Sequence, residues 1–217
     1  TVKAEMGYGR WQETQLPLSL DVDNNERGVP TEYNRYWAFS KWDQWHVNLV
    51  GEKAFNETLT VKGKAFYVDH EDKLEDVSYG DKQTERKWFE WSSYDDYSAG
   101  GDLQAHVQVA DWNLLKMGFT YIKDHHEQQE YLDASCTGVI KGWDQPGLQP
   151  TEEYEADTYS FGLEDEIDVT QNLSAVFGAS YDLYEPVKAH DQPTPDSTDS
   201  FNPQIGLVYS LGGSSQL

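Results

Sequence analysis

A strict alternation of apolar and polar residues is the feature that most constrains how this chain folds. From Leu173 to Leu183 the odd positions read Leu, Ala, Phe, Ala, Tyr and Leu, and the even positions read Ser, Val, Gly, Ser and Asp. Successive side chains of a β-strand point to opposite faces, so this period of two predicts a strand with one apolar face. No stretch sustains the helical period of 3.6, and we therefore predict an all-β chain. The same alternation is found at Val2–Tyr8, Trp45–Leu49, Leu103–Val109, Leu115–Tyr121, Tyr159–Val169 and Ile205–Leu211.

The connections between these segments are of two kinds. Short ones centre on Asn56, Asn113 and Asn172 and on the Gly-rich stretch after Leu211, as is typical of hairpins. Long ones cover residues 12–34, 79–84, 135–152 and 186–200. Long and short connections alternate along the chain, which predicts an antiparallel up-and-down meander of about eight long strands. One rim then carries tight turns and the other carries long loops.

The expected strands are longer than those of most globular proteins. Residues 42–55, 59–78, 88–110 and 114–130 each read as extended, whereas a globular strand averages about 5–6 residues. Apolar alternation fills only the part near the short turn: residues 114–122 alternate, and residues 123–130 are charged. This pattern favours part of a transmembrane β-barrel whose wall extends beyond the bilayer. Aromatic residues near the expected band edges are predicted to form girdles: Trp112, Tyr67, Tyr121, Tyr181 and Tyr184.

Composition excludes several other classes. The 39 acidic and 16 basic residues give a net charge of −23, which argues against nucleic-acid binding because phosphate contacts need a basic face. An aromatic content of 14% argues against disorder, and a single Cys excludes a disulfide framework. The mean hydropathy of −0.77 is compatible with a barrel, since barrel strands are only half apolar.

Both ends of the chain lie inside the repeating β pattern. The sequence begins in an alternating segment at Thr1, with no signal peptide, and it ends just after a turn signal at Leu211. We therefore expect residues 1–217 to be an internal, partial barrel domain that contains neither a plug domain nor the C-terminal strand of the barrel.

Two segments near the C-terminus carry a family resemblance. Leu173–Asp182 is similar to the "Gly-x-Arg/Ser-Tyr-Asp" strand of TonB-dependent outer-membrane receptors, and Phe201–Tyr209 is similar to their "Phe-x-Pro-Lys/Gln-x-Gly-Leu-x-Tyr" strand. Tyr154–Glu166 and Leu115–Tyr121 also look like strands of this family. The resemblance covers most of residues 100–217 and implies a gently curved section of a barrel that has twenty-two strands in this family.

The resemblance also implies a function for the whole protein. Such receptors lie in the bacterial outer membrane and take up ferric siderophores, cobalamin or haem, with energy delivered by TonB through the plug region. Arg and aromatic side chains suit an anionic, ring-bearing chelate. Candidates for binding it lie near the first long loop: Arg10, Trp11, Arg27, Tyr33, Arg35, Tyr36 and Trp37.

Two metal-binding patterns deserve consideration. Asp21, Asp23 and Asn25 have the spacing of an oxygen-rich Ca²⁺ loop, but the Gly at the sixth position and the Glu at the twelfth are missing. His125 and His126 lie close to Glu127 and Glu130. Adjacent strand residues point to opposite faces, so the two imidazoles are not expected to share a site.

Three functional readings remain at this point. We expect a receptor rather than an enzyme, because the sequence contains no specific Ser–His pattern and Cys136 has no activating motif. A passive outer-membrane porin would have the same strands, and a soluble β-barrel that binds a small ligand would turn its apolar side chains inward. Burial separates the last reading from the others: it requires Phe119, Phe161, Leu163 and Phe177 to pack together in a closed centre.

Overall fold

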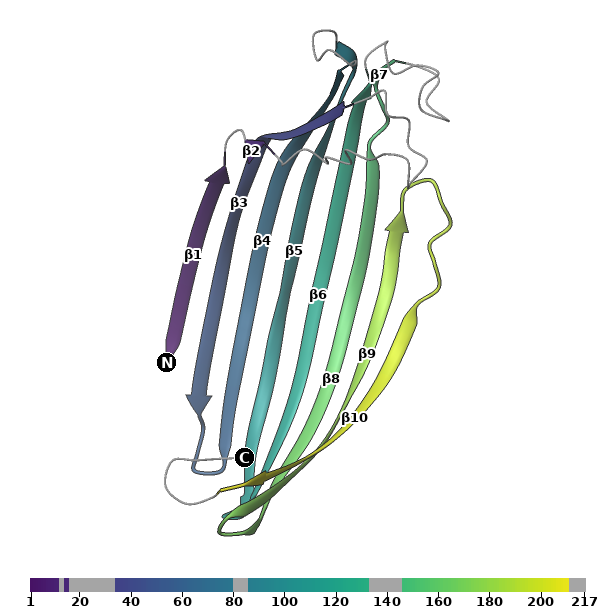
Figure 1. Ribbon diagram of the computed structural model, residues 1–217. Helices are drawn as coiled ribbons and strands as arrows, with labels where there is room; N and C mark the ends of the chain where they lie inside the picture. Colours follow the sequence, from purple (N-terminus) through teal and green to yellow (C-terminus); the bar gives the residue numbers. More distant parts are fainter. Residues whose placement is uncertain (12–13, 16–33, 80–85, 133–145, 211–217) are drawn as a thin grey trace.

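Ten strands form one antiparallel sheet in the computed structural model, which describes residues 1–11, 14–15, 34–79, 86–132 and 146–210 (Figure 1). The strands are β1 (Val2–Trp11), β2 (Thr14–Gln15), β3 (Asn34–Ala54), β4 (Leu59–Tyr79), β5 (Arg86–Ala110), β6 (Asn113–Leu132), β7 (Gly147–Leu148), β8 (Glu152–Thr170), β9 (Leu173–Ala189) and β10 (Thr198–Tyr209). Their spatial order is β1-β3-β4-β5-β6-β8-β9-β10, with the two-residue strands β2 and β7 paired to β3 and β6. Strands that follow one another in sequence are therefore neighbours, which confirms the predicted meander.

The long strands are at least as long as the sequence predicts. β3 and β4 have 21 residues each, β5 has 25 and β6 has 20. The last long connection is shorter than predicted, because residues 186–189 belong to β9. Pro186 is accommodated there next to a β-bulge: Ala156 pairs with Pro186, and the preceding Glu155 pairs with Lys188.

The tight turns lie together at one end of the sheet, at the bottom of Figure 1. In the β3–β4 turn, Asn56 Oδ1 accepts hydrogen bonds from the backbone N–H groups of Thr58 at 2.9 Å and Leu59 at 2.7 Å. This side-chain acceptor takes the place of a backbone carbonyl in the turn, which is why Asn suits the position. The β5–β6 turn, which begins at Asp111, and the β8–β9 turn, which begins at Gln171, are shorter still, with two residues between the strands in each.

The strand register sorts the side chains onto two faces. Phe119 pairs with Leu103 on one side and Phe161 on the other, and the row continues through Tyr181 to Phe201. We call the face that carries this row the outer face, and the opposite face the inner face. Phe119 is 37% exposed, and Phe161 and Leu163 are each 53% exposed, so no closed apolar centre covers them. The burial pattern required by a soluble ligand-binding barrel is therefore not found.

The outer face changes character along the strands, as the sequence predicts. The apolar rows end at aromatic side chains whose ring centroids lie 5.0 Å apart for Trp45 and Tyr67 and 5.2 Å apart for Tyr121 and Tyr159. Tyr97 continues this girdle, with its ring 5.8 Å from that of Tyr67. Beyond the girdle, toward the long loops, the outer positions are charged: Asp43, Asp69, Asp95, Lys123, Asp157, Glu185 and Asp199.

Tyr184 does not join this girdle, contrary to the sequence prediction. It pairs with Thr158 and Thr198, which places it on the inner face, where it lines a pocket. The sequence placed Tyr184 by its distance from the apolar band alone, but its parity along β9 decides the face.

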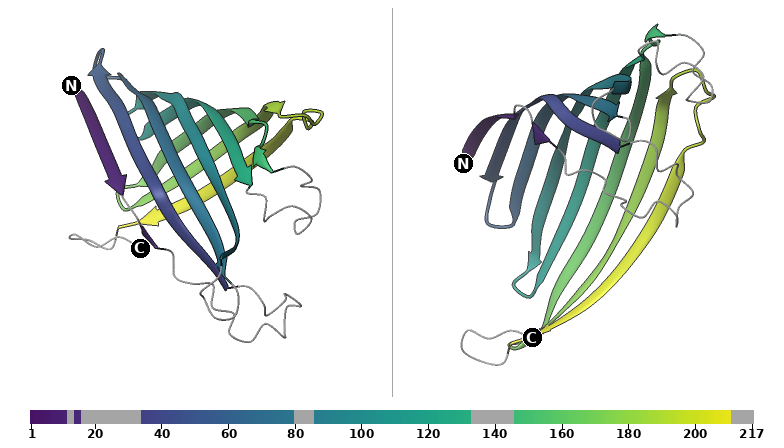
Figure 2. Two further views of the ribbon diagram at one scale, coloured as in Figure 1. Left: turned by 90° about the horizontal axis from the view of Figure 1, so that it is seen from above. Right: turned by 45° about the horizontal axis from the view of Figure 1, so that its top comes forward.

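The sheet bends into a curved wall (Figure 2). In the described part of the chain, no helix is long and apolar enough to span a membrane.

Candidate functional site

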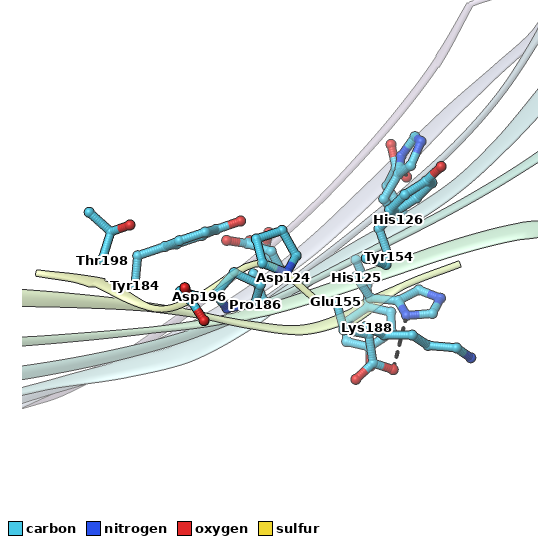
Figure 3. A pocket seen from close by; sticks show the side chains of 16 residues that line it. Asp124, His125, His126, Tyr154, Glu155, Tyr184, Pro186, Lys188, Asp196 and Thr198 are labelled. Atoms are coloured by element: carbon cyan, nitrogen blue, oxygen red, sulfur yellow. Dashed lines mark hydrogen bonds and ion pairs between the residues drawn. The ribbon is translucent and has the colours of Figure 1, made fainter. Parts of the chain in front are cut away.

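The inner face holds a pocket of about 520 Å³, which Figure 3 shows from close by. Its lining residues come from the long-loop ends of the strands. Strands β5, β6, β8 and β9 form its floor, and the connection between β9 and β10 contributes Pro195 and Asp196. Inner-face side chains supply most of its polar groups: Asp96, Ser98, Asp124, His126, Tyr154 and Tyr184.

One rung of the sheet positions the central group of the pocket. His126 pairs with Asp96 on β5 and with Tyr154 on β8, so all three side chains share the inner face. His126 Nδ1 lies 2.6 Å from Asp96 Oδ1, which fixes the ring orientation. The ring centroid of His126 lies 5.9 Å from that of Tyr154 and 5.8 Å from that of Tyr94. The result is an imidazole that is held by a carboxylate and flanked by two phenol rings.

The next rung toward the girdle brings a hydroxyl and a second carboxylate into the same pocket. Ser98 pairs with Asp124, and the Ser98 hydroxyl donates a hydrogen bond to the Asp124 carboxylate. The bulge at Glu155 and Ala156 displaces β9 at this level. After β9, His190 adopts a positive φ of 44° and its N–H donates to the Glu153 carbonyl at 2.9 Å, which directs the following residues over the pocket.

A second polar group lies on the inner face of β4, beside this pocket. His70 Nε2 lies 2.8 Å from Asp72 Oδ2, and the His70 ring packs edge-on against Trp42 with centroids 5.0 Å apart. Asp72 Oδ1 is buried and has no hydrogen-bond partner among the described residues. Burial raises the pKa of Asp72, and the nearby Asp96 carboxylate raises it further, while His70 opposes the shift. Asp72 lies beyond the aromatic girdle, five positions after Tyr67.

The side chains of the pocket and of the neighbouring His70–Asp72 group are suited to binding a solute by hydrogen bonds and ring packing. Carboxylates at Asp72, Asp96 and Asp124 accept hydrogen bonds, and the rings of Tyr154 and His126 offer flat surfaces for packing. The Ser98 hydroxyl donates to Asp124 and not to a histidine, so it is not arranged as an activated nucleophile. A solute with hydrogen-bond donors and an unsaturated ring would suit the site.

The candidate residues from the sequence lie elsewhere in the chain. Arg10 and Trp11 end β1 and pair with Asp43 and Trp42, and Arg35, Tyr36 and Trp37 lie in β3, where they pair with β4. These five residues thus lie on β1 and β3, and not on β5, β6, β8 or β9, which form the floor of the pocket. Arg27 and Tyr33 lie outside the described residues, as do the candidate Ca²⁺ ligands Asp21, Asp23 and Asn25. Their roles stay predictions.

Sequence reasoning missed the pocket residues because it lacked the strand register. His126 was visible only as one half of a His125–His126 pair, and its partners Asp96 and Tyr154 lie 30 and 28 residues away in the sequence. A usable signal exists nevertheless. If β5 and β6 are paired outward from the short turn at Asp111, His126 falls opposite Asp96 to within one residue, the size of the bulge near Ala110.

Comparison with known proteins agrees with this architecture. Residues 3–217 match the family described as "TonB dependent receptor-like, beta-barrel". The chain belongs to the TonB-dependent receptor family. Among solved structures, this receptor barrel is similar to BauA, the ferric preacinetobactin receptor from Acinetobacter baumannii, with a TM-score of 0.57 and 12% sequence identity. The alignment covers 82% of this chain and 29% of BauA, and it shows a shared fold. No curated protein matches the sequence.

Proposed function

We propose that this receptor barrel forms part of the wall of an outer-membrane transporter that takes up a large, scarce solute, with a ferric siderophore as the first candidate. Family membership and the neighbour's description as a ferric siderophore receptor support this assignment. The observation that carries it is the two-faced wall: apolar rows and an aromatic girdle lie outside, and polar, hydrogen-bonding side chains lie inside. That is the arrangement of a barrel that separates lipid from a watery lumen.

Partners follow from the same proposal. Outer-membrane lipid contacts the rows that include Phe119 and Phe161, and TonB acts through a plug region. The edges of β1 and β10 are not paired with each other, so further strands of the same barrel would complete the wall there.

The charged groups of the inner pocket indicate which chemical groups the solute would carry. The sequence-based candidates, with their arginines, favour an anionic chelate, whereas the described pocket presents Asp96, Asp124 and Asp196. These carboxylates favour a solute whose face toward β6 and β8 carries hydrogen-bond donors or positive charge. The arginines near β1 and β3 are then proposed to meet a different, anionic part of the same solute.

An uptake experiment tests the proposal. A strain that lacks the gene is compared with its parent for uptake of iron-loaded catecholate, hydroxamate and mixed siderophores, and of haem and cobalamin. We expect the loss of one solute class, reproduced by deletion of TonB. His126→Ala and Tyr154→Phe are expected to weaken binding of that solute by about tenfold. Each substitution removes a side-chain group that would contact the solute from the paired row Asp96–His126–Tyr154.

Two results would contradict the proposal. Unchanged uptake of every solute class would exclude a receptor for these compounds. Passage of small sugars that depends on the gene but not on TonB would instead support the passive porin.

A further inference from the structure

A second cluster of polar side chains lies on the outer face, beyond the aromatic girdle. His125 on β6 pairs with Glu155 on β8, and the neighbouring outer position on β8 is Glu153. Ligand atoms of His125, Glu153 and Glu155 all lie within 4.8 Å of one another. In Figure 3, His125 and Glu155 lie on one side of the sheet and His126 and Tyr154 on the other. The cluster's side chains therefore point away from His126 and Tyr154, although His125 and Glu155 are also among the residues that line the pocket.

The imidazole of His125 is held in place by packing, but one of its ring nitrogens makes no hydrogen bond. His125 stacks on Tyr97 with ring centroids 4.8 Å apart, and its side chain is only 13% exposed. Its Nδ1 lies 3.4 Å from Glu155 Oε1 yet is buried without a hydrogen-bond partner in the described part of the chain. A buried ring nitrogen that makes no hydrogen bond costs free energy, and a bound cation would remove that cost.

We propose that His125, Glu153 and Glu155 bind a divalent transition-metal ion of the Zn²⁺ type. One imidazole nitrogen and two carboxylate oxygens are ligands that Zn²⁺ accepts at about 2.0–2.2 Å, which places tetrahedral ligands about 3.4 Å apart. The ligand atoms lie within 4.8 Å of one another, so rotations that shorten these separations by up to about 1.4 Å would complete the site. Three protein ligands leave a fourth position, which a water molecule fills.

Two lysines form ion pairs with the carboxylates of this cluster and should affect its affinity for a metal ion. Lys123 Nζ lies 2.8 Å from Glu155 Oε2, and Lys188 forms an ion pair with Glu153 Oε2. Each lysine contacts one oxygen of its carboxylate, so the other oxygen is available to the metal. The ammonium of Lys188 competes with a bound cation, while outer-face carboxylates such as Asp69, Asp95 and Glu127 favour it.

Zinc titration of the detergent-purified, metal-stripped protein tests the inference, without any transported solute present. Calorimetry of the unaltered protein should show one Zn²⁺ equivalent that His125→Ala and, separately, Glu153→Gln weaken by about tenfold or more, since even outer-shell partners of zinc ligands are worth that much. Lys188→Gln should tighten the same site by about twofold to fivefold, because it removes a competing surface charge. A purely structural role for the cluster would not produce this gain.

His126→Ala is the matched control, because it removes the neighbouring imidazole from the inner face of the same strand. Zinc affinity should be unchanged in this variant, and heat-modifiable migration on gels should show that every variant is folded. The inference is overturned if His125→Ala and Glu153→Gln bind zinc like the unaltered protein. It is also overturned if His126→Ala alone loses the site. Neither result depends on which solute the receptor takes up.

Discussion

At the residue scale, Asp165 shows how a carboxylate can be placed in an apolar row. Its position on β8 belongs to the outer face, between Leu115 on β6 and Phe177 on β9, where it interrupts the apolar alternation of Tyr159–Val169. Asn113 resolves the difficulty: it is only 8% exposed, and its Nδ2 donates to Asp165 Oδ1 at 2.5 Å. Asn113 follows the short turn at Asp111, so the pair lies at the turn end of the wall. A charged side chain there costs less free energy than it would at the middle of the bilayer.

Replacing Asn113 by Ala should therefore leave the Asp165 carboxylate without its donor. We expect the free energy of unfolding to fall by about 1.5–3 kcal/mol, the range for a hydrogen bond to a charged group. Urea titration in lipid bilayers, followed by Trp fluorescence, would measure the change. The control is the same substitution in an Asp165→Ala background, where the cost should be much smaller. Equal costs in both backgrounds would show that the pair does not stabilise the protein.

Asp72 gives a prediction about pH. Burial raises its pKa above the ordinary value of 3.8, so between that value and the raised one the folded protein holds a proton that the unfolded chain has lost. The free energy of unfolding should therefore decrease as pH rises through this window, and the penalty should remain at neutral pH. Asp72→Asn cannot titrate, so its stability should vary less with pH. Urea titrations from pH 3.5 to 7 measure this, and identical pH profiles for the two proteins would contradict it.

At the element scale, strand pairing depends on where glycines lie. A Cβ built on Gly100 of β5 would lie 2.3 Å from the Tyr121 carbonyl oxygen and 2.9 Å from the Phe66 ring. Phe66 pairs with Gly100, so its ring covers the space that the missing side chain leaves. Gly162 of β8 is different, because a Cβ there would meet nothing within 4 Å.

The two glycines make a matched pair of tests. Gly100→Ala should destabilise the protein by about 1–3 kcal/mol, since a backbone carbonyl must move to make room. Gly162→Ala should be neutral or stabilising by up to about 1 kcal/mol, because it only restricts the unfolded chain. Urea titrations of the two variants, side by side, measure the difference. A larger loss at Gly162 than at Gly100 would show that the close approach of β5 and β6 is not as described.

At the scale of the whole molecule, the main feature of the wall is the difference in polarity between its outer and inner faces. Outer rows are apolar from the turns up to the girdle and charged beyond it, whereas inner rows are polar along most of their length. Among the described residues, no second layer of secondary structure packs on either face of the sheet. Lipid covers the outer rows in the proposed receptor, and water, solute and plug occupy the inner side.

Substitutions on the two faces of one strand should reveal this difference. Leu163→Arg places a charge in the middle of the outer apolar band and should cost about 2–4 kcal/mol in a bilayer. Ser160→Arg places the same side chain on the inner face, three residues away and beside Asp182, and should cost little. Folding yield and urea stability in lipid vesicles measure both effects. Equal tolerance of the two substitutions would contradict a lipid-facing outer surface.

The sequence by itself determined the local features: the strands, their lengths, the end that carries tight turns and the level at which Tyr121 gives way to Lys123. These follow from period-two alternation and turn chemistry, which act between residues close in the chain. Tertiary structure alone decided which distant side chains meet. His126 joins Asp96 and Tyr154, while its neighbour His125 joins Glu153 and Glu155 on the other face. The reason is physical: pairing register and bulges are set by the whole sheet, and a one-residue shift exchanges the two faces of a strand.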